Sequence, residues 1–226
     1  MNIKTVRRIM NRNSLALPYA KHRNRTRRKD LTKPVNINRL WETDIHYVST
    51  GEGMFYLMSI KDCFSKKWIS YEFSRTCTAK DALKAVEKAY AVRFPGKIPH
   101  SLVLRTDNGP QYISEIFRNT VKILGIKSEY IQKHTPEDNG DIETFEDAEK
   151  LMEYAFTDYN TIRPHSSISF LSPDVFEKRW IEDEDFRNEF LEERNRKEER
   201  IMKNRIEKKR RLRENVSYND RICVQY

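Results

Sequence analysis

Apolar and aromatic residues gather in three short runs between residues 40 and 75. The runs are LWETDIHYVST (40–50), FYLMSIKDCFS (55–65) and KWISYEFSR (67–75). Gly51-Glu52-Gly53 separates the first two runs, and Ser65-Lys66 separates the next two. Short runs rich in Ile, Tyr, Phe and Trp between turn residues are typical of strands. The pattern therefore predicts an antiparallel meander of three strands.

The apolar spacing then becomes helical. Apolar residues at 82, 83, 86, 90 and 92–94 predict a helix over 78–94, begun by Thr78 or Asp81 and ended by Pro95-Gly96. SLVLRTD (101–107) is a nearly continuous apolar run, which is typical of a strand covered on both faces.

Three further elements complete the middle of the chain. EIFRNTVKILG (115–125) predicts a helix closed by Gly125, KSEYIQK (127–133) predicts a strand, and a last helix is expected from about Asp141 towards Tyr159. Three strands are thus followed by alternating helices and strands. This order predicts an α/β fold in which helices flank a mixed sheet.

The two ends of the chain differ from this middle part. Residues 2–12 carry apolar side chains at helical spacing and predict a short amphipathic helix. Beyond Pro173 the sequence favours helix, but apolar positions become rare after Leu191 and no heptad repeat persists. We therefore expect three parts: a basic arm (1–39), a core (40–176) and a charged helical tail (177–226).

Charge is unevenly distributed along the chain. The net charge is +9, and residues 1–39 alone hold twelve Lys or Arg and one acid. A basic arm on a near-neutral body is typical of a protein that binds a polyanion, most often nucleic acid, although a solvated, disordered arm has the same composition. The arm residues expected to contact DNA phosphates are Lys21, Arg23, Arg25, Arg27, Arg28 and Lys29.

Cysteine usage and hydropathy exclude several classes. Cys63, Cys77 and Cys223 form no CxxC pair and lie near no histidine cluster, so neither a zinc site nor a disulfide scaffold is indicated. No apolar run approaches the ~20 residues needed to cross a bilayer. The arginine-rich start lacks the apolar core of a secretory signal, while an organelle transit peptide stays an alternative. We expect a cytoplasmic protein without a membrane anchor.

Three acids stand at positions where carboxylates can do chemistry. Asp107 ends an apolar strand just before the turn Asn108-Gly109-Pro110, Asp44 lies among apolar neighbours in the first strand, and Glu143 lies near the start of the last helix. Three converging carboxylates repel one another unless they bind a divalent cation, and oxygen ligands favour Mg²⁺ or Mn²⁺. Each acid also has a structural interpretation, as an Asx turn, a strand-end polar residue and a first-turn acid respectively.

The motifs around these acids are more specific than the acids alone. They are W-x-T-D (41–44), T-D-N-G (106–109), N-G-D-I-E (139–143), YNTIRPHSSI (159–168) and LSPDVF (171–176). In this order the chain resembles the DDE recombinases, the insertion-sequence transposases with a retroviral-integrase-type core, over roughly 40–176. The resemblance implies a ribonuclease-H-like fold, with Asp44, Asp107 and Glu143 as catalytic residues and as ligands of two Mg²⁺ or Mn²⁺ ions.

The resemblance also implies a function and partners. It implies DNA transposition or integration by metal-dependent phosphodiester hydrolysis and strand transfer, on DNA and as a homo-oligomer, with the protein associated with the nucleoid. The alternatives are a non-catalytic DNA-binding remnant that occupies DNA or interferes with a full-length transposase, and an unrelated nuclease of the same fold. The Tyr-Asn and Arg-Pro-His segments disfavour the last of these.

Several further residues have two interpretations each. Lys150 lies two helical turns after Glu143 and is expected to contact a DNA phosphate, although neighbouring acids make that helix face negative. His46, Asn139, Arg163 and His165 either contact DNA or support the fold, and Asp62 is expected to support the fold.

The chain departs from the family pattern in two places. Only the end of the family's helix-turn-helix region resembles residues 2–18, and GDIE (140–143) runs directly into TFEDAEK (144–150), as if a segment between two helices were deleted. Because two-metal catalysis tolerates little misplacement, we expect the shortened chain to have weak or no activity.

Overall fold

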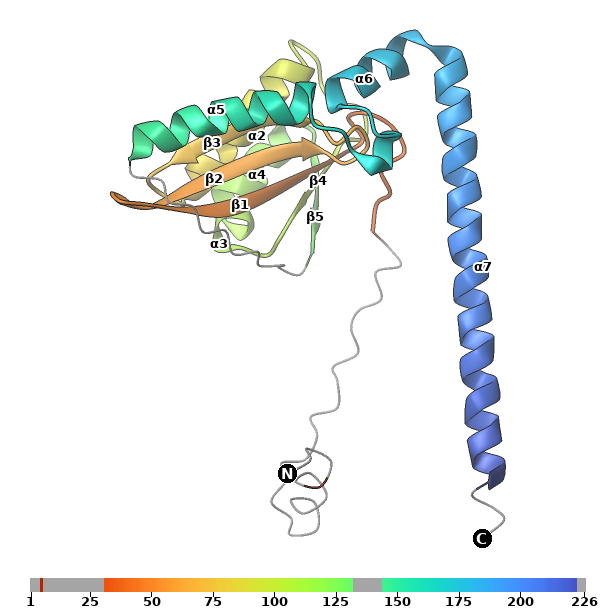
Figure 1. Ribbon diagram of the computed structural model, residues 1–226. Helices are drawn as coiled ribbons and strands as arrows, with labels where there is room; N and C mark the ends of the chain where they lie inside the picture. The colour runs from red at the N-terminus through yellow and green to blue at the C-terminus, as the bar shows by residue number, and fades with distance from the viewer. Residues whose placement is uncertain (1–4, 6–30, 132–143, 223–226) are drawn as a thin grey trace. The chain divides into compact units, whose positions relative to one another are not determined.

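A computed structural model of the protein describes residue 5 and residues 31–131 and 144–222 (Figure 1). The chain divides into two units, Met1–Thr32 and Lys33–Tyr226, and the fold described below belongs to the second. Among the residues that the structure describes, no helix combines the length and apolar character needed to cross a membrane.

The centre of the second unit is a five-stranded mixed sheet. Its strands are β1 (Leu40–Thr50), β2 (Gly53–Asp62), β3 (Trp68–Ser74), β4 (Val103–Thr106) and β5 (Lys127–Tyr130). They lie in the order β3-β2-β1-β4-β5, with β1, β2 and β3 antiparallel and β4 and β5 parallel to β1. The expected meander and mixed sheet are confirmed. This strand order, with helices on the sheet, makes the fold α/β and ribonuclease-H-like.

Six α-helices accompany the sheet in the described part of the chain (Figure 1). They are α2 (Ala79–Arg93), α3 (Pro110–Ile113), α4 (Glu115–Ile123), α5 (Phe145–Thr161), α6 (Pro173–Glu182) and α7 (Glu184–Ile222). Thr78 and Asp81 both contribute to the start of α2, because they form a reciprocal capping box. The short helix α3 was not predicted from the sequence.

The last core helix begins later than the sequence predicts. Thr144 has an extended backbone and its side chain accepts a hydrogen bond from the backbone N–H of Asp147, so α5 begins at Phe145 and not near Asp141. Glu143 itself lies outside the described residues.

One face of the sheet carries the main apolar core. Trp41, Met58, Ile60 and Leu104 are fully buried there, against α2 and α4. Side chains alternate between the two faces of a strand, and the register that pairs Trp41 with Asp62 and Thr43 with Ile60 keeps these apolar positions together.

The opposite face is covered over only part of its width. Phe55 and Leu57 of β2 and Phe73 of β3 pack against Phe145 and Ala148 of α5. On this same face Glu42, Asp44 and His46 of β1 line a cavity instead of an apolar layer. The functional site is therefore sought beside α5.

The charged tail begins inside the packed body. Trp180 of α6 and Phe186 and Phe190 of α7 are buried against Phe64 and Phe176, so the packing continues across the boundary expected after residue 176. From residue 195 to residue 208 every side chain of α7 is exposed, which agrees with the long charged helix predicted from the sequence.

Candidate active site

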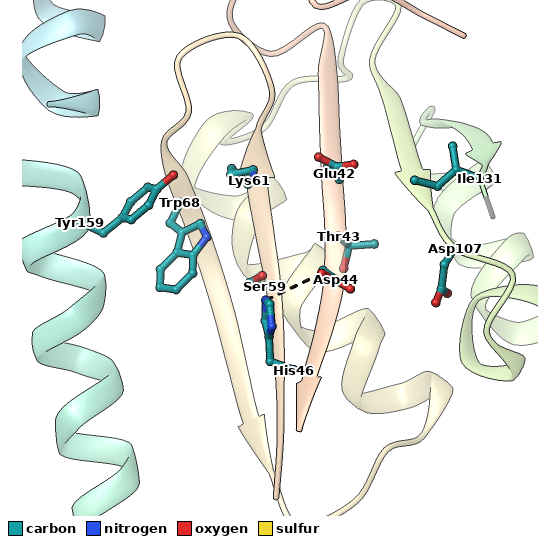
Figure 2. Close-up of a pocket in the computed structure, with 10 residues that line it drawn as sticks. All are labelled: Glu42, Thr43, Asp44, His46, Ser59, Lys61, Trp68, Asp107, Ile131 and Tyr159. Atoms are coloured by element: carbon teal, nitrogen blue, oxygen red, sulfur yellow. Dashed lines mark ion pairs between the residues drawn. The ribbon is translucent and has the colours of Figure 1, made fainter. Parts of the chain in front are cut away.

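Asp44 and Asp107 come from neighbouring strands and face the same cavity. The parallel register pairs Leu40 with Val103 and Glu42 with Arg105, and continued by two residues it sets Asp44 level with Asp107. Both residues line a cavity of about 370 Å³ (Figure 2). Their arrangement on adjacent strands and on one face is as the sequence predicts; their role as metal ligands stays a prediction.

A tight turn sets the position of Asp107. Strand β4 ends at Thr106, and one Asp107 oxygen, Oδ1, accepts a 2.8 Å hydrogen bond from the backbone N–H of Gly109. A Cβ atom at position 109 would lie only 2.8 Å from that same oxygen, so a larger residue there would displace the Asp107 carboxylate. Pro110 then starts α3 and carries the chain away. Asp107 therefore forms an Asx turn and also faces the cavity, because the turn uses only one of its two carboxylate oxygens.

Asp44 is held more loosely than an acid with a structural role would be. Its side chain is 51% exposed, and its Oδ2 lies 3.8 Å from Nε2 of His46. Within the described part of the chain, its Oδ1 accepts a hydrogen bond from the N–H of the next residue, Ile45, and from no other group. His46 shares this face of β1 and also lines the cavity (Figure 2). The carboxylate is therefore free to take a further ligand.

A buried tyrosine supports both acids from inside the fold. Tyr112 of α3 is 1% exposed, and its hydroxyl lies 3.1 Å from Oγ1 of Thr43 in a hydrogen bond. Burial, and then the negative charges of Asp107 and Asp44, raise the pKa of the Tyr112 hydroxyl well above its ordinary value. Both carboxylates thus act on one neutral hydroxyl. Tyr112 was not predicted from the sequence. It could have been found as an aromatic residue two positions after Pro110, which begins the helix.

The far wall of the cavity is aromatic. Tyr159 of α5 stacks on Trp68 of β3, with ring centroids 5.0 Å apart and planes 19° from parallel. Asn160 fixes this contact, because its side chain accepts from the backbone N–H of Trp68 and donates to the Trp68 carbonyl. The Tyr-Asn pair of the YNTIRPHSSI motif therefore joins α5 to the sheet and supplies one wall residue.

Two charged residues of the cavity were not among the predicted site residues. Glu42 lies two residues before Asp44 on the same face, and its cross-strand partner Lys61 lies on β2 (Figure 2). The signal that could have found them was the strand alternation. A residue two positions from a functional acid faces the same way, and so does the residue paired with it.

Other predicted residues lie elsewhere. Asp62 is fully buried, accepts hydrogen bonds from the N–H groups of Asn38, Phe64 and Ser65, and has its pKa raised by burial, so it supports the fold as expected. His165 packs on Tyr159 with ring centroids 4.5 Å apart, while Lys150 is exposed and does not line the cavity.

The remaining predicted residues lie outside the described part of the chain. They are Glu143, Asn139 and the arm residues Lys21, Arg23, Arg25, Arg27, Arg28 and Lys29. Within residues 31–131 and 144–222 no group of three His, Cys, Asp or Glu side chains comes together at metal-binding distance. The described site therefore contains two of the three predicted acids.

Comparison with known proteins identifies this region of the chain. Residues 35–136 match the family model "Integrase core domain". The transposase of insertion sequence element IS904 from Lactococcus lactis is 30% identical over 159 residues, which are 62% of this chain and 62% of the relative. Transposase InsF of insertion sequence IS3A from Escherichia coli is 29% identical over 160 residues, 63% of this chain and 54% of the relative. The chain thus spans less than two thirds of these relatives.

Solved structures of low identity are also similar. The HTLV-2 integrase catalytic core domain in complex with magnesium is 16% identical, with a TM-score of 0.47 over 64% of this chain and 99% of that one. The catalytic domain of Mos1 mariner transposase is 16% identical, with a TM-score of 0.42 over 53% and 70%. By sequence, residues 35–136 thus match an integrase core domain, and the chain is similar over 62–63% of its length to insertion-sequence transposases.

Proposed function

We propose that the protein acts in DNA transposition or integration, by metal-dependent phosphodiester hydrolysis and strand transfer. The observation that carries this proposal is the placement of Asp44 and Asp107. In the region that matches an integrase core domain, two carboxylates from neighbouring parallel strands face one cavity. By the resemblance, Glu143 adds a third carboxylate.

The residues present fit a divalent cation. Two carboxylates facing one cavity repel each other, and among the described residues the one basic side chain within ion-pair distance of Asp44 is His46, 3.8 Å away. The donors are carboxylate oxygens, which favour Mg²⁺ or Mn²⁺ over softer metals. We therefore assign Asp44 and Asp107, with Glu143, as the residues that would hold two such ions.

The chain's own residues would position the substrate. The bound ions would lower the pKa of an attacking water or DNA 3′-hydroxyl and offset charge on the leaving oxygen. Asp44 and Asp107 would fix the place of this chemistry, and the Trp68–Tyr159 wall would limit the approach of the DNA strand to the open side of the cavity.

A covalent intermediate on cysteine does not fit this site. Burial first, and then the neighbouring charge of Glu42, raise the pKa of the Cys63 thiol to about 12, so it stays protonated and poorly nucleophilic. The proposed reaction uses direct attack by water or by a DNA end on phosphorus, which needs no cysteine nucleophile.

Residues outside the cavity would supply most of the DNA affinity. We propose that the arm residues Lys21 to Lys29 contact phosphates without much sequence preference, and that the protein works as a homo-oligomer on DNA in association with the nucleoid. The exposed acids Glu146, Asp147 and Glu149 on α5 would repel phosphates, so we expect slow turnover.

The test is a cleavage and strand-transfer assay on DNA carrying the element's own ends, with Mg²⁺ or Mn²⁺ supplied. Asp44→Asn and Asp107→Asn should each lower the rate by about 10²-fold or more, because the reacting geometry tolerates little change. Asp147→Asn, an exposed acid outside the cavity, is the matched control and should not lower it. DNA binding without any metal-dependent cleavage by the unaltered chain would instead support a non-catalytic, DNA-occupying role.

A further inference from the structure

The cavity has two chemically different ends. Asp44 and Asp107 lie on one side, and Lys61 lies on the opposite side beside Trp68 and Tyr159 (Figure 2). Lys61 pairs across the strands with Glu42, and Asp44 pairs with Ser59, so the lysine lies one strand over and two residues along from Asp44. Standard strand spacings put the two Cα atoms about 8 Å apart.

Lys61 lines the cavity and differs from three nearby lysines of the described core. Lys67, Lys84 and Lys88 each lie within ion-pair distance of one or more carboxylates. Lys61 is half-buried, yet among the described residues no carboxylate lies within 4.0 Å of its ammonium group. A charge that is partly removed from water without a partner is costly, and an anion entering the cavity would remove that cost.

The surrounding charges extend this positive end. Burial lowers the pKa of His165, and Arg163, Lys61 and Lys66 lower it further, so three cations act on the ring that packs against Tyr159. Among the described lining residues Lys61 is the one lysine or arginine, with Glu42 across the strands from it, and it offers an anion a charged donor, while Asp44 and Asp107 farther along attract cations.

We infer that Lys61 binds a phosphate of the substrate strand next to the scissile phosphate, so that the strand crosses the cavity from the cationic end to the two acids. This inference rests on the proposed function, since it assigns the direction in which DNA lies at that site. It makes Lys61 a substrate-binding residue, with an ammonium group that donates a charge-assisted hydrogen bond to a non-bridging phosphate oxygen.

Two substitutions separate charge from packing at this position. Lys61→Met keeps an unbranched side chain of similar length without the charge, and Lys61→Arg keeps the charge. Lys122→Ala, an exposed lysine on α4, is the matched control. We expect Lys61→Met to lower kcat/KM for cleavage by about ten- to a hundredfold, Lys61→Arg to restore most of it and Lys122→Ala to change nothing.

A binding measurement makes the result independent of catalysis. In the Asp107→Asn background, fluorescence anisotropy with duplex DNA over a range of salt concentrations should give a slope of log affinity against log salt that is smaller by about one for Lys61→Met. Replacing the flanking phosphates one at a time by neutral methylphosphonates should reveal one position that lowers the DNA affinity of the protein with Lys61 and leaves the DNA affinity of Lys61→Met unchanged.

The outcomes distinguish this inference from the proposed function. If the unaltered chain does not cleave but Lys61→Met still reduces the salt slope and matches one phosphate, the proposed reaction fails and the phosphate site stands. If the chain cleaves while Lys61→Met equals it in kcat/KM, salt slope and methylphosphonate pattern, the phosphate site is overturned and the proposed reaction stands.

Discussion

The two faces of strand β1 show how one short sequence serves both stability and function. Its odd-numbered side chain Trp41 is fully buried beneath α2, whereas its even-numbered side chain Asp44 is half exposed in the cavity. The strand alternation alone separates them. The face that helices cover is apolar and stabilises the fold. The partly covered face brings like-charged carboxylates together, and these add nothing to stability.

Two aspartates of the β1–β2 pair differ in the same way. Asp62 is fully buried and its carboxylate accepts three backbone N–H groups, so its hydrogen-bonding capacity is used by the protein itself. The Asp44 carboxylate accepts one hydrogen bond, from its own neighbour, and is open to solvent. The carboxylate of a structural acid has its hydrogen bonds supplied by the protein, whereas the carboxylate of a functional acid can still bind a ligand.

Removing the largest side chain of the covered face should affect the fold most. Trp41→Ala deletes a fully buried indole in contact range of Phe94, whose ring centroid lies 5.7 Å away. We expect the free energy of unfolding to fall by about 3–5 kcal/mol, a large part of the stability of an ordinary domain. Urea denaturation followed by circular dichroism measures it, and a loss below about 1 kcal/mol would contradict this description of the core.

The next largest effect is expected where the tail joins the body. Glu177 of α6 is 5% exposed and accepts two hydrogen bonds from Arg93 of α2, at 2.9 and 2.6 Å, and one from Ser65. Glu177→Ala leaves the Arg93 charge buried without this partner and should destabilise the fold by about 3 kcal/mol.

A second substitution identifies the cause. Glu177→Ala combined with Arg93→Met removes both charges, so it should recover part of the loss seen in urea denaturation. If the double variant is as unstable as the sum of the two single variants, the buried ion pair is not the reason for the loss.

A smaller effect is expected at the start of α2. Burial alone would raise the pKa of Asp81, but hydrogen bonds from Thr76 and Thr78 outweigh it and lower the pKa to about 2. The folded pKa is depressed, so this stabilisation is present above the ordinary pKa near 4 and is lost as the pH falls towards 2. Asp81→Asn should cost about 1 kcal/mol at neutral pH. Between pH 5 and about 2, the free energy of unfolding of Asp81→Asn should fall less steeply than that of the parent chain. An equal fall in both proteins would contradict the assignment.

The sequence predicted the elements whose signals are local. The three strands between residues 40 and 75 and a helix begun by Thr78 or Asp81 were predicted because alternation, turns and caps are all encoded within a few neighbouring residues. Helix α3, with four residues, is too short to show a period. The start of α5 was placed too early because Asp141 and Thr144 are both good caps, and local pattern does not choose between them.

The site was predictable only in part for a related reason. Asp44 and Asp107 stood out because an acid in an apolar strand is unusual. Lys61 and Tyr159 enter the cavity through strand pairing and the docking of α5, and neither is visible in local sequence. Lys150, expected near DNA from its spacing after Glu143, does not line the cavity, because the helix on which it lies begins later and packs beside β3.

Asp44 and Asp107 are proposed to bind a divalent cation together. Thermal unfolding with increasing Mn²⁺ tests it directly, on the parent chain, Asp44→Asn, Asp107→Asn and the control Asp147→Asn. Without metal, the first two variants should be as stable as the parent or slightly more so, since each removes one of two like charges. With Mn²⁺ at ten times its Kd, the parent and the control should gain about 1.4 kcal/mol and the two site variants should gain little. An equal gain in all four proteins would contradict the claim.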